Sequence, residues 1–113
     1  MNVLRLDSVV FETPDVARAR KFYVDTLGLH VGTFVKDGAT VADEDEKYFN
    51  LEVGGTLLGF ELGQTQAGTI VLMVDDLKAA LDELADRQVK PTRQAANFAI
   101  IADPDGREII LQA

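Results

Sequence analysis

The chain has 113 residues, with 19 acidic and 11 basic side chains, a net charge of −8 and no cysteine. This length fits one domain with one hydrophobic core, and 47% apolar with 27% charged residues is ordinary for a soluble globular protein. The absence of cysteine excludes disulfide frameworks, thiolate metal sites and cysteine nucleophiles. Apolar runs fall far short of the roughly 18 residues of a membrane span, and Lys and Arg are scattered. We therefore expect no nucleic-acid or membrane partner. Residues 1–5 lack the basic-then-apolar pattern of a signal peptide, so we expect a cytoplasmic protein.

The first half of the chain predicts one helix followed by strands. Residues 4–11 predict a strand, and Asp15 is a candidate N-cap for the helix after it. The helix shows apolar residues at helical spacing and is expected to end at Gly28 in the left-handed conformation; its stripe is Val16, Ala19, Tyr23 and Leu27.

The remainder of this half predicts three strands. We expect residues 29–36 to form one strand and the acidic residues 37–47 to form a loop. Residues 48–53 and 56–62 flank Gly54-Gly55, which is typical of a two-residue hairpin. Residues 43–46 are predicted to be a solvated loop tip, with an acidic lip over a binding site as the alternative.

The second half predicts the same order of elements. A strand at residues 69–74 precedes a candidate N-cap at Asp75-Asp76 and a helical face of Leu77, Ala80, Leu81 and Leu84. Asp103-Pro104-Asp105-Gly106 has the residue preferences of a type I turn. The predicted strands around that turn are residues 89–94, 98–102 and 108–112.

The two halves can be superimposed by a shift of 61 residues, which places Ser8 on Thr69, Asp15 on Asp76 and Tyr23 on Leu84. The order βαβββ therefore occurs twice, which indicates two related halves. We expect an α+β fold in which residues 1–113 are one domain of two βαβββ modules, about 1–63 and 64–113, that form a curved mixed sheet. One helix covers one face of each half, so the other face forms a cup.

This arrangement resembles the vicinal oxygen chelate superfamily, which includes glyoxalase I, extradiol dioxygenases, fosfomycin resistance enzymes and bleomycin-binding resistance proteins. The matching segments lie in family order over nearly the whole chain; they are residues 6–11, 15–23, 27–29, 74–77 and 103–106. The resemblance implies the glyoxalase/bleomycin resistance fold, and the metal-free bleomycin-binding type is closest in character.

The resemblance also implies a divalent metal in the cup, held by the first and last strands of each half. On the first strand of each half these positions hold Ser8 and Thr69, and on the last strand of the second half the position holds Ile110. The remaining position is Gly59 or Glu61, which share a face because side chains alternate along a strand. Hydroxyl and aliphatic side chains bind such ions poorly, so we expect no metal and no cofactor. His30 is expected to be a surface residue.

Alternation along each strand divides the sheet residues into two groups. The cup face is predicted to carry Leu6, Ser8, Val10, Leu57, Gly59, Glu61, Thr69, Val71, Met73, Glu108, Ile110 and Gln112. The residues predicted to pack under the helices are Val9, Phe11, Leu58, Phe60, Leu62, Ile70, Leu72, Ile109 and Leu111.

A mostly apolar cup with a few polar groups is typical of a small-molecule site. The candidate ligand-binding residues are Ser8, Val10, Phe34, Tyr48, Leu57, Gly59, Glu61, Thr69, Met73, Phe98 and Ile110. We expect a homodimer that sequesters a cationic or aromatic compound, as in antibiotic resistance. The alternative is a glyoxalase-like lyase or dioxygenase with atypical ligands, or acid–base chemistry at Glu61 if burial raises the pKa of its carboxyl. The sequence leaves the identity of the ligand open.

Overall fold

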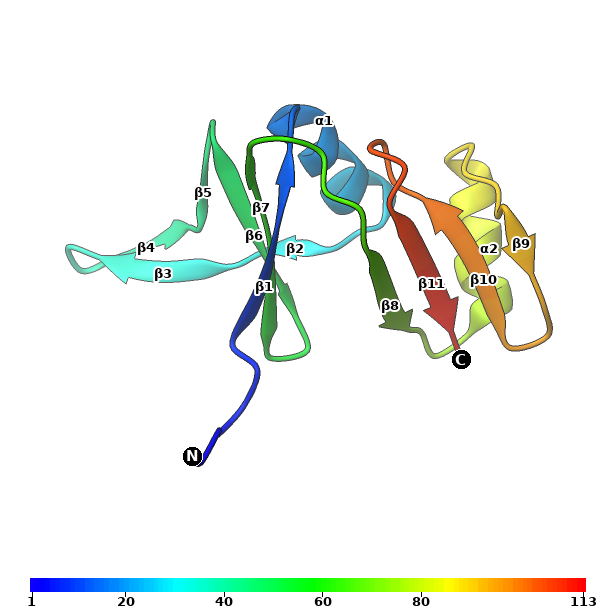
Figure 1. Cartoon of the computed structure of the whole chain (residues 1–113), viewed down its shortest axis with the longest axis horizontal. Coiled ribbons are helices and arrows are strands. Elements are labelled where there is room, and N and C mark those ends of the chain that lie inside the picture. The colour runs from blue at the N-terminus through cyan, green and yellow to red at the C-terminus, as the bar shows by residue number, and fades with distance from the viewer. The chain divides into compact units, whose positions relative to one another are not determined.

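The computed structural model describes residues 1–113, which divide into two compact units, Met1–Thr65 and Gln66–Ala113. Each unit contains a mixed β-sheet and helical structure, as the labels in Figure 1 show, so the predicted α+β class is confirmed. No helix is long and apolar enough to cross a membrane.

The sheet of unit 1 has four strands in the order β1-β7-β6-β2, and a short fifth strand, β5, also pairs with β6. The strands are β1 (Ser8–Thr13), β2 (His30–Val31), β5 (Glu44–Asp45), β6 (Tyr48–Val53) and β7 (Thr56–Leu62). β1 and β7 run parallel, whereas β6 is antiparallel to β7, β2 and β5. The predicted β6–β7 hairpin is confirmed, with φ of +57° at Gly54 and +89° at Gly55.

One helical segment packs on this sheet. Helix α1 (Val16–Arg20) continues directly into a π-helix, η1 (Lys21–Thr26). Both predicted ends are confirmed: the Asp15 side chain accepts a hydrogen bond from the Arg18 amide at 3.0 Å, and Gly28 has φ +77°. Tyr23 is fully buried, with its ring centroid 4.4 Å from that of Phe60, so the helix supplies the unit 1 core.

The predicted loop at residues 37–47 is wrong. The chain instead forms a two-stranded hairpin, β3 (Thr33–Lys36) and β4 (Ala39–Ala42), which we call the arm, and then β5. Asp37 (φ +51°) and Gly38 (φ +78°) make the turn of the arm, and Asp-Gly favours this two-residue turn because both positions need positive φ. The predicted single strand 29–36 is interrupted at Gly32, where the arm begins.

The sheet of unit 2 has the order β8-β11-β10-β9. Its elements are β8 (Thr69–Met73), α2 (Leu77–Asp86), β9 (Arg93–Gln94), β10 (Phe98–Ala102) and β11 (Glu108–Gln112). Asp76 caps α2 by accepting a hydrogen bond from the Ala79 amide at 3.0 Å, as predicted. The strand predicted at residues 89–94 is reduced to its last two residues, because Pro91 has no amide hydrogen to give to a sheet.

The two sheets have equivalent strand orders, with β1, β7, β6 and β2 corresponding to β8, β11, β10 and β9. β1 is parallel to β7, and β8 is parallel to β11. The arm and β5 have no counterpart in unit 2. The repeat predicted from the sequence is therefore present in the pairing of the strands.

Burial follows the predicted alternation in most positions. Five residues predicted to lie under the helices are buried: Leu58, Phe60, Ile70, Ile109 and Leu111. Phe11 and Leu72 are half-buried. The prediction is wrong for Val9 and Leu62, which are 38% and 53% exposed, because Val9 lies on an edge strand and Leu62 is the last residue of β7.

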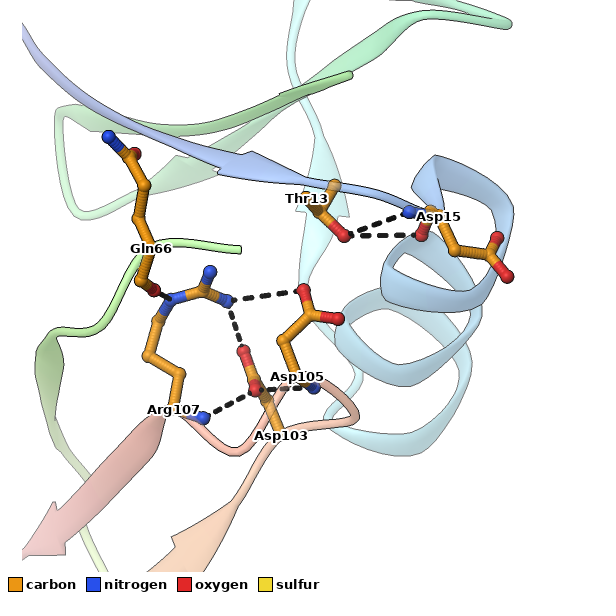
Figure 2. A network of polar contacts seen from close by, with 6 residues as sticks. All are labelled: Thr13, Asp15, Gln66, Asp103, Asp105 and Arg107. Atoms are coloured by element: carbon orange, nitrogen blue, oxygen red, sulfur yellow. Dashed lines mark hydrogen bonds and ion pairs between the residues drawn. The ribbon is translucent and has the colours of Figure 1, made fainter. Parts of the chain in front are cut away.

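A buried polar network holds the turn between β10 and β11 (Figure 2). Arg107 pairs with Asp103, and its Nε donates to the Gln66 carbonyl at 3.2 Å. The Asp103 carboxylate also accepts from the amides of Asp105 and Arg107 at 2.9 and 2.8 Å. The predicted turn is confirmed by the Gly106 amide, which donates to the Asp103 carbonyl at 3.0 Å.

Candidate functional site

Six of the predicted site residues share one face of the unit 1 sheet. Strand partners in register lie on the same face, so the pairing arranges this face in rows across β1, β7 and β6. The rows are Ser8–Leu57–Glu52, Val10–Gly59–Asn50 and Glu12–Glu61–Tyr48. The opposite face carries Phe49, Leu58 and Phe60, which are buried. We call the surface that carries these three rows the unit 1 face.

The strand registers show which of Gly59 and Glu61 is the equivalent of Ile110 in unit 2. In unit 2, Val71 pairs with Ile110, and in unit 1 its equivalent, Val10, pairs with Gly59. Gly59 therefore occupies the position in unit 1 that Ile110 occupies in unit 2, and Glu61 corresponds to Gln112. The sequence alone could not separate the two residues because they lie on the same side of β7.

Four other predicted site residues share one face of the unit 2 sheet: Thr69, Met73, Phe98 and Ile110. Met73 is 71% exposed, and its neighbour Val71 is 52% exposed. The guanidinium carbon of Arg93 lies 5.8 Å from the centroid of the Phe98 ring, so this ring already contacts a cation within the chain. We call this surface the unit 2 face.

Phe34 does not lie on the unit 1 face. It lies on β3 of the arm, opposite Val41, and is 42% exposed. The predicted contribution of Phe34 to a wall of the cup therefore has no support within unit 1.

A hydrogen-bonded group on the unit 1 face includes two residues that the sequence analysis missed, Asp43 and Asn50. The Asp43 carboxylate accepts one hydrogen bond from the Tyr48 hydroxyl at 3.0 Å and another from Asn50 Nδ2 at 2.9 Å. The hydrogen bond to Asp43 is the largest cause of a raised pKa at the Tyr48 hydroxyl, since ionisation would place two negative charges side by side. The alternation of β6 was the available signal for Asn50, whereas Asp43 was hidden in an apparent loop.

Backbone hydrogen bonds fix this group where the arm leaves the sheet. The Asp43 amide donates to the Gly32 carbonyl at 2.7 Å, and the Asn50 amide donates to the Asp43 carbonyl at 3.0 Å. The Gly32 amide in turn donates to the Asn50 carbonyl at 2.8 Å. The position of the Asp43 carboxylate over the unit 1 face therefore follows from the way the arm leaves the sheet.

Glu61 lies on the unit 1 face but is exposed, and it makes no hydrogen bond or ion pair with the chain. Its role as a proton acceptor was conditional on burial. Within unit 1 that condition is not met, so Glu61 is a solvated carboxylate beside Glu12 and Tyr48.

The side chains at the four family metal positions do not fit a divalent ion. The positions that the resemblance implies, with Gly59 taken as the equivalent of Ile110, are Ser8, Gly59, Thr69 and Ile110. Two hydroxyls, a hydrogen and a hydrocarbon provide neither imidazole nor carboxylate. Groups of three or more His, Asp or Glu side chains that could hold a metal ion are absent as well.

One groove of about 430 Å³ lies in unit 2, between α2 and the segment that leads into β10. Leu77, Leu81, Ala85 and Val89 form its apolar lining, with Lys78 and Lys90 beside them. None of the predicted site residues lines it.

Comparison with solved structures shows the same fold over almost the entire chain. An integron cassette protein from the mobile metagenome of Vibrio cholerae, VCH_CASS1, is 19% identical, with a TM-score of 0.73 over 98% of this chain and 95% of that chain. A glyoxalase/bleomycin resistance protein from Catenulispora acidiphila DSM 44928 is 21% identical, with a TM-score of 0.72 over 96% and 97%. TioX from Micromonospora sp. ML1 is 12% identical, with a TM-score of 0.72 over 95% and 96%.

No curated protein matches the sequence. The family model for the Glyoxalase/Bleomycin resistance protein/Dioxygenase superfamily matches residues 5–111, which include both βαβββ repeats. The chain belongs to the Glyoxalase/Bleomycin resistance protein/Dioxygenase superfamily.

Proposed function

We propose that this protein binds a cationic or aromatic small molecule without a metal ion and releases it unchanged. One observation supports the proposal: Gly59 and Ile110 occupy equivalent register positions beside the equivalent strands that begin with Ser8 and Thr69, and these are the four positions where the resemblance implies metal ligands. None of these side chains has a carboxylate or an imidazole to coordinate a divalent ion. Without a Lewis acid, the oxyanion stabilisation that the superfamily's enzymes share has no source at these positions.

The composition of the two faces supports binding of an organic molecule. Val10, Val71 and Met73 are 49%, 52% and 71% exposed, which is unusual for large apolar side chains of a sheet. Accessible apolar side chains with a few polar groups beside them are typical of ligand sites. Both faces therefore offer contact area for an apolar or aromatic ligand.

The arm supports a homodimer. All residues of β3 and all but one of β4 are exposed, and Phe34 and Val35 are 42% and 73% exposed. An isolated two-stranded hairpin is marginally stable in water, so the arm gains stability when a second surface covers it. We propose that a second copy of the chain provides that surface. Sedimentation should show a dimer that the Val35→Lys substitution weakens.

A ligand screen in the absence of metal tests the function. Chelator-treated protein is incubated with a panel of cationic, neutral and anionic aromatic compounds, and its unfolding temperature is measured. We expect cationic or aromatic compounds to raise the unfolding temperature and to be recovered intact by mass spectrometry. Adding Zn²⁺, Mn²⁺, Fe²⁺ or Ni²⁺ should leave both the melting temperature and the ligand affinity unchanged.

Two variants make the screen specific to the proposed surface. Val10→Lys places a cation on the unit 1 face, so it should weaken cationic ligands. Val3→Lys makes the same change at an exposed residue outside the sheets and should have no effect. Turnover of a glutathione hemithioacetal or a catechol would overturn the proposal in favour of a lyase or dioxygenase. Equal binding to the wild-type and Val10→Lys proteins would remove the unit 1 face from it.

A further inference from the structure

The side-chain amide of Asn50 has a defined orientation on the unit 1 face. Its Nδ2 donates to Asp43 Oδ2 at 2.9 Å, and an ionised carboxylate can only accept hydrogen bonds. The NH₂ group must therefore face Asp43, and the carbonyl oxygen, Oδ1, must point the other way. The second carboxylate oxygen of Asp43 is held by the Tyr48 hydroxyl at 3.0 Å, which fixes the carboxylate in turn.

The absence of a side chain at Gly59 makes room for this oxygen. A Cβ atom at position 59 would lie 2.3 Å from Asn50 Oδ1 and 3.3 Å from Val10 Cγ2, so any larger residue would collide with the amide. Asn50 Oδ1 thus lies across β7 in the central row of the unit 1 face, next to the exposed methyl groups of Val10. The corresponding positions in unit 2 are Ile110 and Ile100, so that unit has no such polar gap.

Asn50 Oδ1 is an accessible acceptor that the chain itself does not use. The side chain makes one hydrogen bond, through Nδ2, and none through Oδ1. Oδ1 is also not a buried atom, so a group from outside the chain can reach it. Its direction is nevertheless fixed by Asp43 and Tyr48. An acceptor that is held in place but unpaired is suited to a donor from outside the chain, because no side-chain rotation has to be frozen on binding.

The charges on this face favour a cationic donor. The rows around Asn50 contain Glu12, Glu52 and Glu61, and none of the residues in these rows is Lys or Arg. Glu61 makes no ion pair with the chain and lies one row along β7 from Gly59, at about 7 Å for two residues of strand. A cation near Asn50 would therefore be attracted by the carboxylates of these rows, and no Lys or Arg of the rows would repel it.

We propose that the unit 1 face recognises a protonated organic amine, whose N–H group donates to Asn50 Oδ1 while its apolar body lies on Val10 and Leu57. Glu61 supplies the negative charge, and Asp43 and Tyr48 are positioning residues that hold the amide. This inference rests on the proposed function and names the chemistry of its ligand. It differs from that function in requiring an N–H donor and not merely a positive charge or an aromatic ring.

Three matched probes separate these requirements: 2-(1-naphthyl)ethylamine, its N,N,N-trimethylammonium analogue and 2-(1-naphthyl)ethanol. They share one aromatic body but differ in charge and in N–H donors. Isothermal titration calorimetry at neutral pH should show the amine binding about 10-fold or more tightly than either analogue, because a hydrogen bond to a charged donor is among the strong ones. The trimethylated analogue should in turn bind better than the alcohol.

Variants assign these preferences to residues. Asn50→Leu should lower the affinity for the amine about 10-fold and leave the trimethylated analogue unchanged, which abolishes the preference between them. Glu61→Gln should weaken both cations equally, whereas Glu46→Gln removes an exposed carboxylate outside the rows and should weaken neither. Should Asn50→Leu fail to fold, Gly59→Ala displaces the same oxygen while Asn50 remains. The side-chain amide resonances of Asn50 in the wild-type protein should also shift on addition of the amine.

Two results would overturn the inference. One is equal affinity for the amine and its trimethylated analogue, and the other is a preference that survives both Asn50→Leu and Gly59→Ala. If the three probes bind equally and Val10→Lys weakens them, the proposed function stands and only the amine is wrong. If none of the three binds, the inference fails, and the wider screen decides the proposed function separately.

Discussion

Arg107 and Asp103 form an ion pair in which neither side chain is exposed to solvent. The two residues lie on opposite sides of the turn between β10 and β11. The Asp103 carboxylate also accepts hydrogen bonds from the backbone amides of Asp105 and Arg107. Arg107 also reaches the Gln66 carbonyl, at the first residue of unit 2. A single buried guanidinium therefore joins the turn to the segment that precedes β8.

Removing one member of this pair should be strongly destabilising, since the other charge would stay buried without its partner. We expect Arg107→Met to lower the free energy of unfolding by about 3–5 kcal/mol, measured by urea denaturation. Arg87→Met provides the matched control, because the Arg87–Glu83 pair is 38% and 57% exposed. That change should cost less than about 1 kcal/mol. Equal costs for the two variants would contradict the structural role assigned to Arg107.

Much of the fold could be predicted from local chemistry that tertiary contacts do not override. The N-caps Asp15 and Asp76, the left-handed Gly28 and the Gly54-Gly55 hairpin each follow from the conformational preference of one or two residues. The wrong predictions lie where a short turn signal stands inside a longer polar segment. The Asp37-Gly38 turn of the arm was hidden by the polar residues around it, although Asp-Gly favours a hairpin on its own.

The candidate site was predictable only as far as alternation along a strand allows. Period two placed Ser8, Val10, Leu57 and Glu61 on one face, but the choice between Gly59 and Glu61 required the pairing of β7 with β1. Asn50 and Asp43 were missed because their role depends on how the arm leaves the sheet, which brings Asp43, between β4 and β5, next to Asn50 on β6. Phe34 was expected on the sheet for the same reason, but it lies on β3 of the arm.

The helix caps provide a prediction about the repeat. Asp15 and Asp76 each accept a hydrogen bond of 3.0 Å from an amide of the first turn. Asp15→Ala and Asp76→Ala should each lower the free energy of unfolding by about 1 kcal/mol, because the amide loses its acceptor. Asp75→Ala removes an adjacent carboxylate that caps nothing and should change stability by less than about 0.5 kcal/mol. Thermal or urea denaturation gives the free energy of unfolding of the three variants. If Asp75→Ala lowers it as much as Asp76→Ala does, the capping assignment is contradicted.

The contact between Gly59 and Asn50 predicts a coupling between two substitutions. Gly59→Ala introduces a methyl group at 2.3 Å from Asn50 Oδ1, so it should lower the free energy of unfolding by about 1–3 kcal/mol. In the Asn50→Ala background the amide is gone and the nearest of the other atoms is Val10 Cγ2, at 3.3 Å, so the cost should largely disappear. A double-mutant cycle measured by urea denaturation gives the coupling energy. Additive costs would mean that the amide does not lie over β7.

The hydrogen bond from Tyr48 to Asp43 predicts a late ionisation of this tyrosine. The nearby carboxylate raises the pKa of the Tyr48 hydroxyl above its ordinary value of 10.0. An alkaline titration followed by phenolate absorption should therefore show a high-pH step that is absent in Tyr48→Phe. Asp43→Asn keeps an acceptor but removes the negative charge, so it should move this step to lower pH. A step at the ordinary value in the wild-type protein would contradict the contact.

The same shift determines how stability changes at high pH. The folded protein binds the Tyr48 proton more tightly than the unfolded chain does, so the contribution is complete below pH 10.0 and is lost as pH rises towards the raised pKa. Over that interval the unfolded state carries fewer protons at this site, and the free energy of unfolding must decrease. The wild-type protein should thus lose stability more steeply above pH 10.0 than Tyr48→Phe, which has no proton to release there. Urea denaturation of both proteins across this range measures the difference in slope, and parallel curves would show that the hydroxyl does not hold the Asp43 carboxylate in solution.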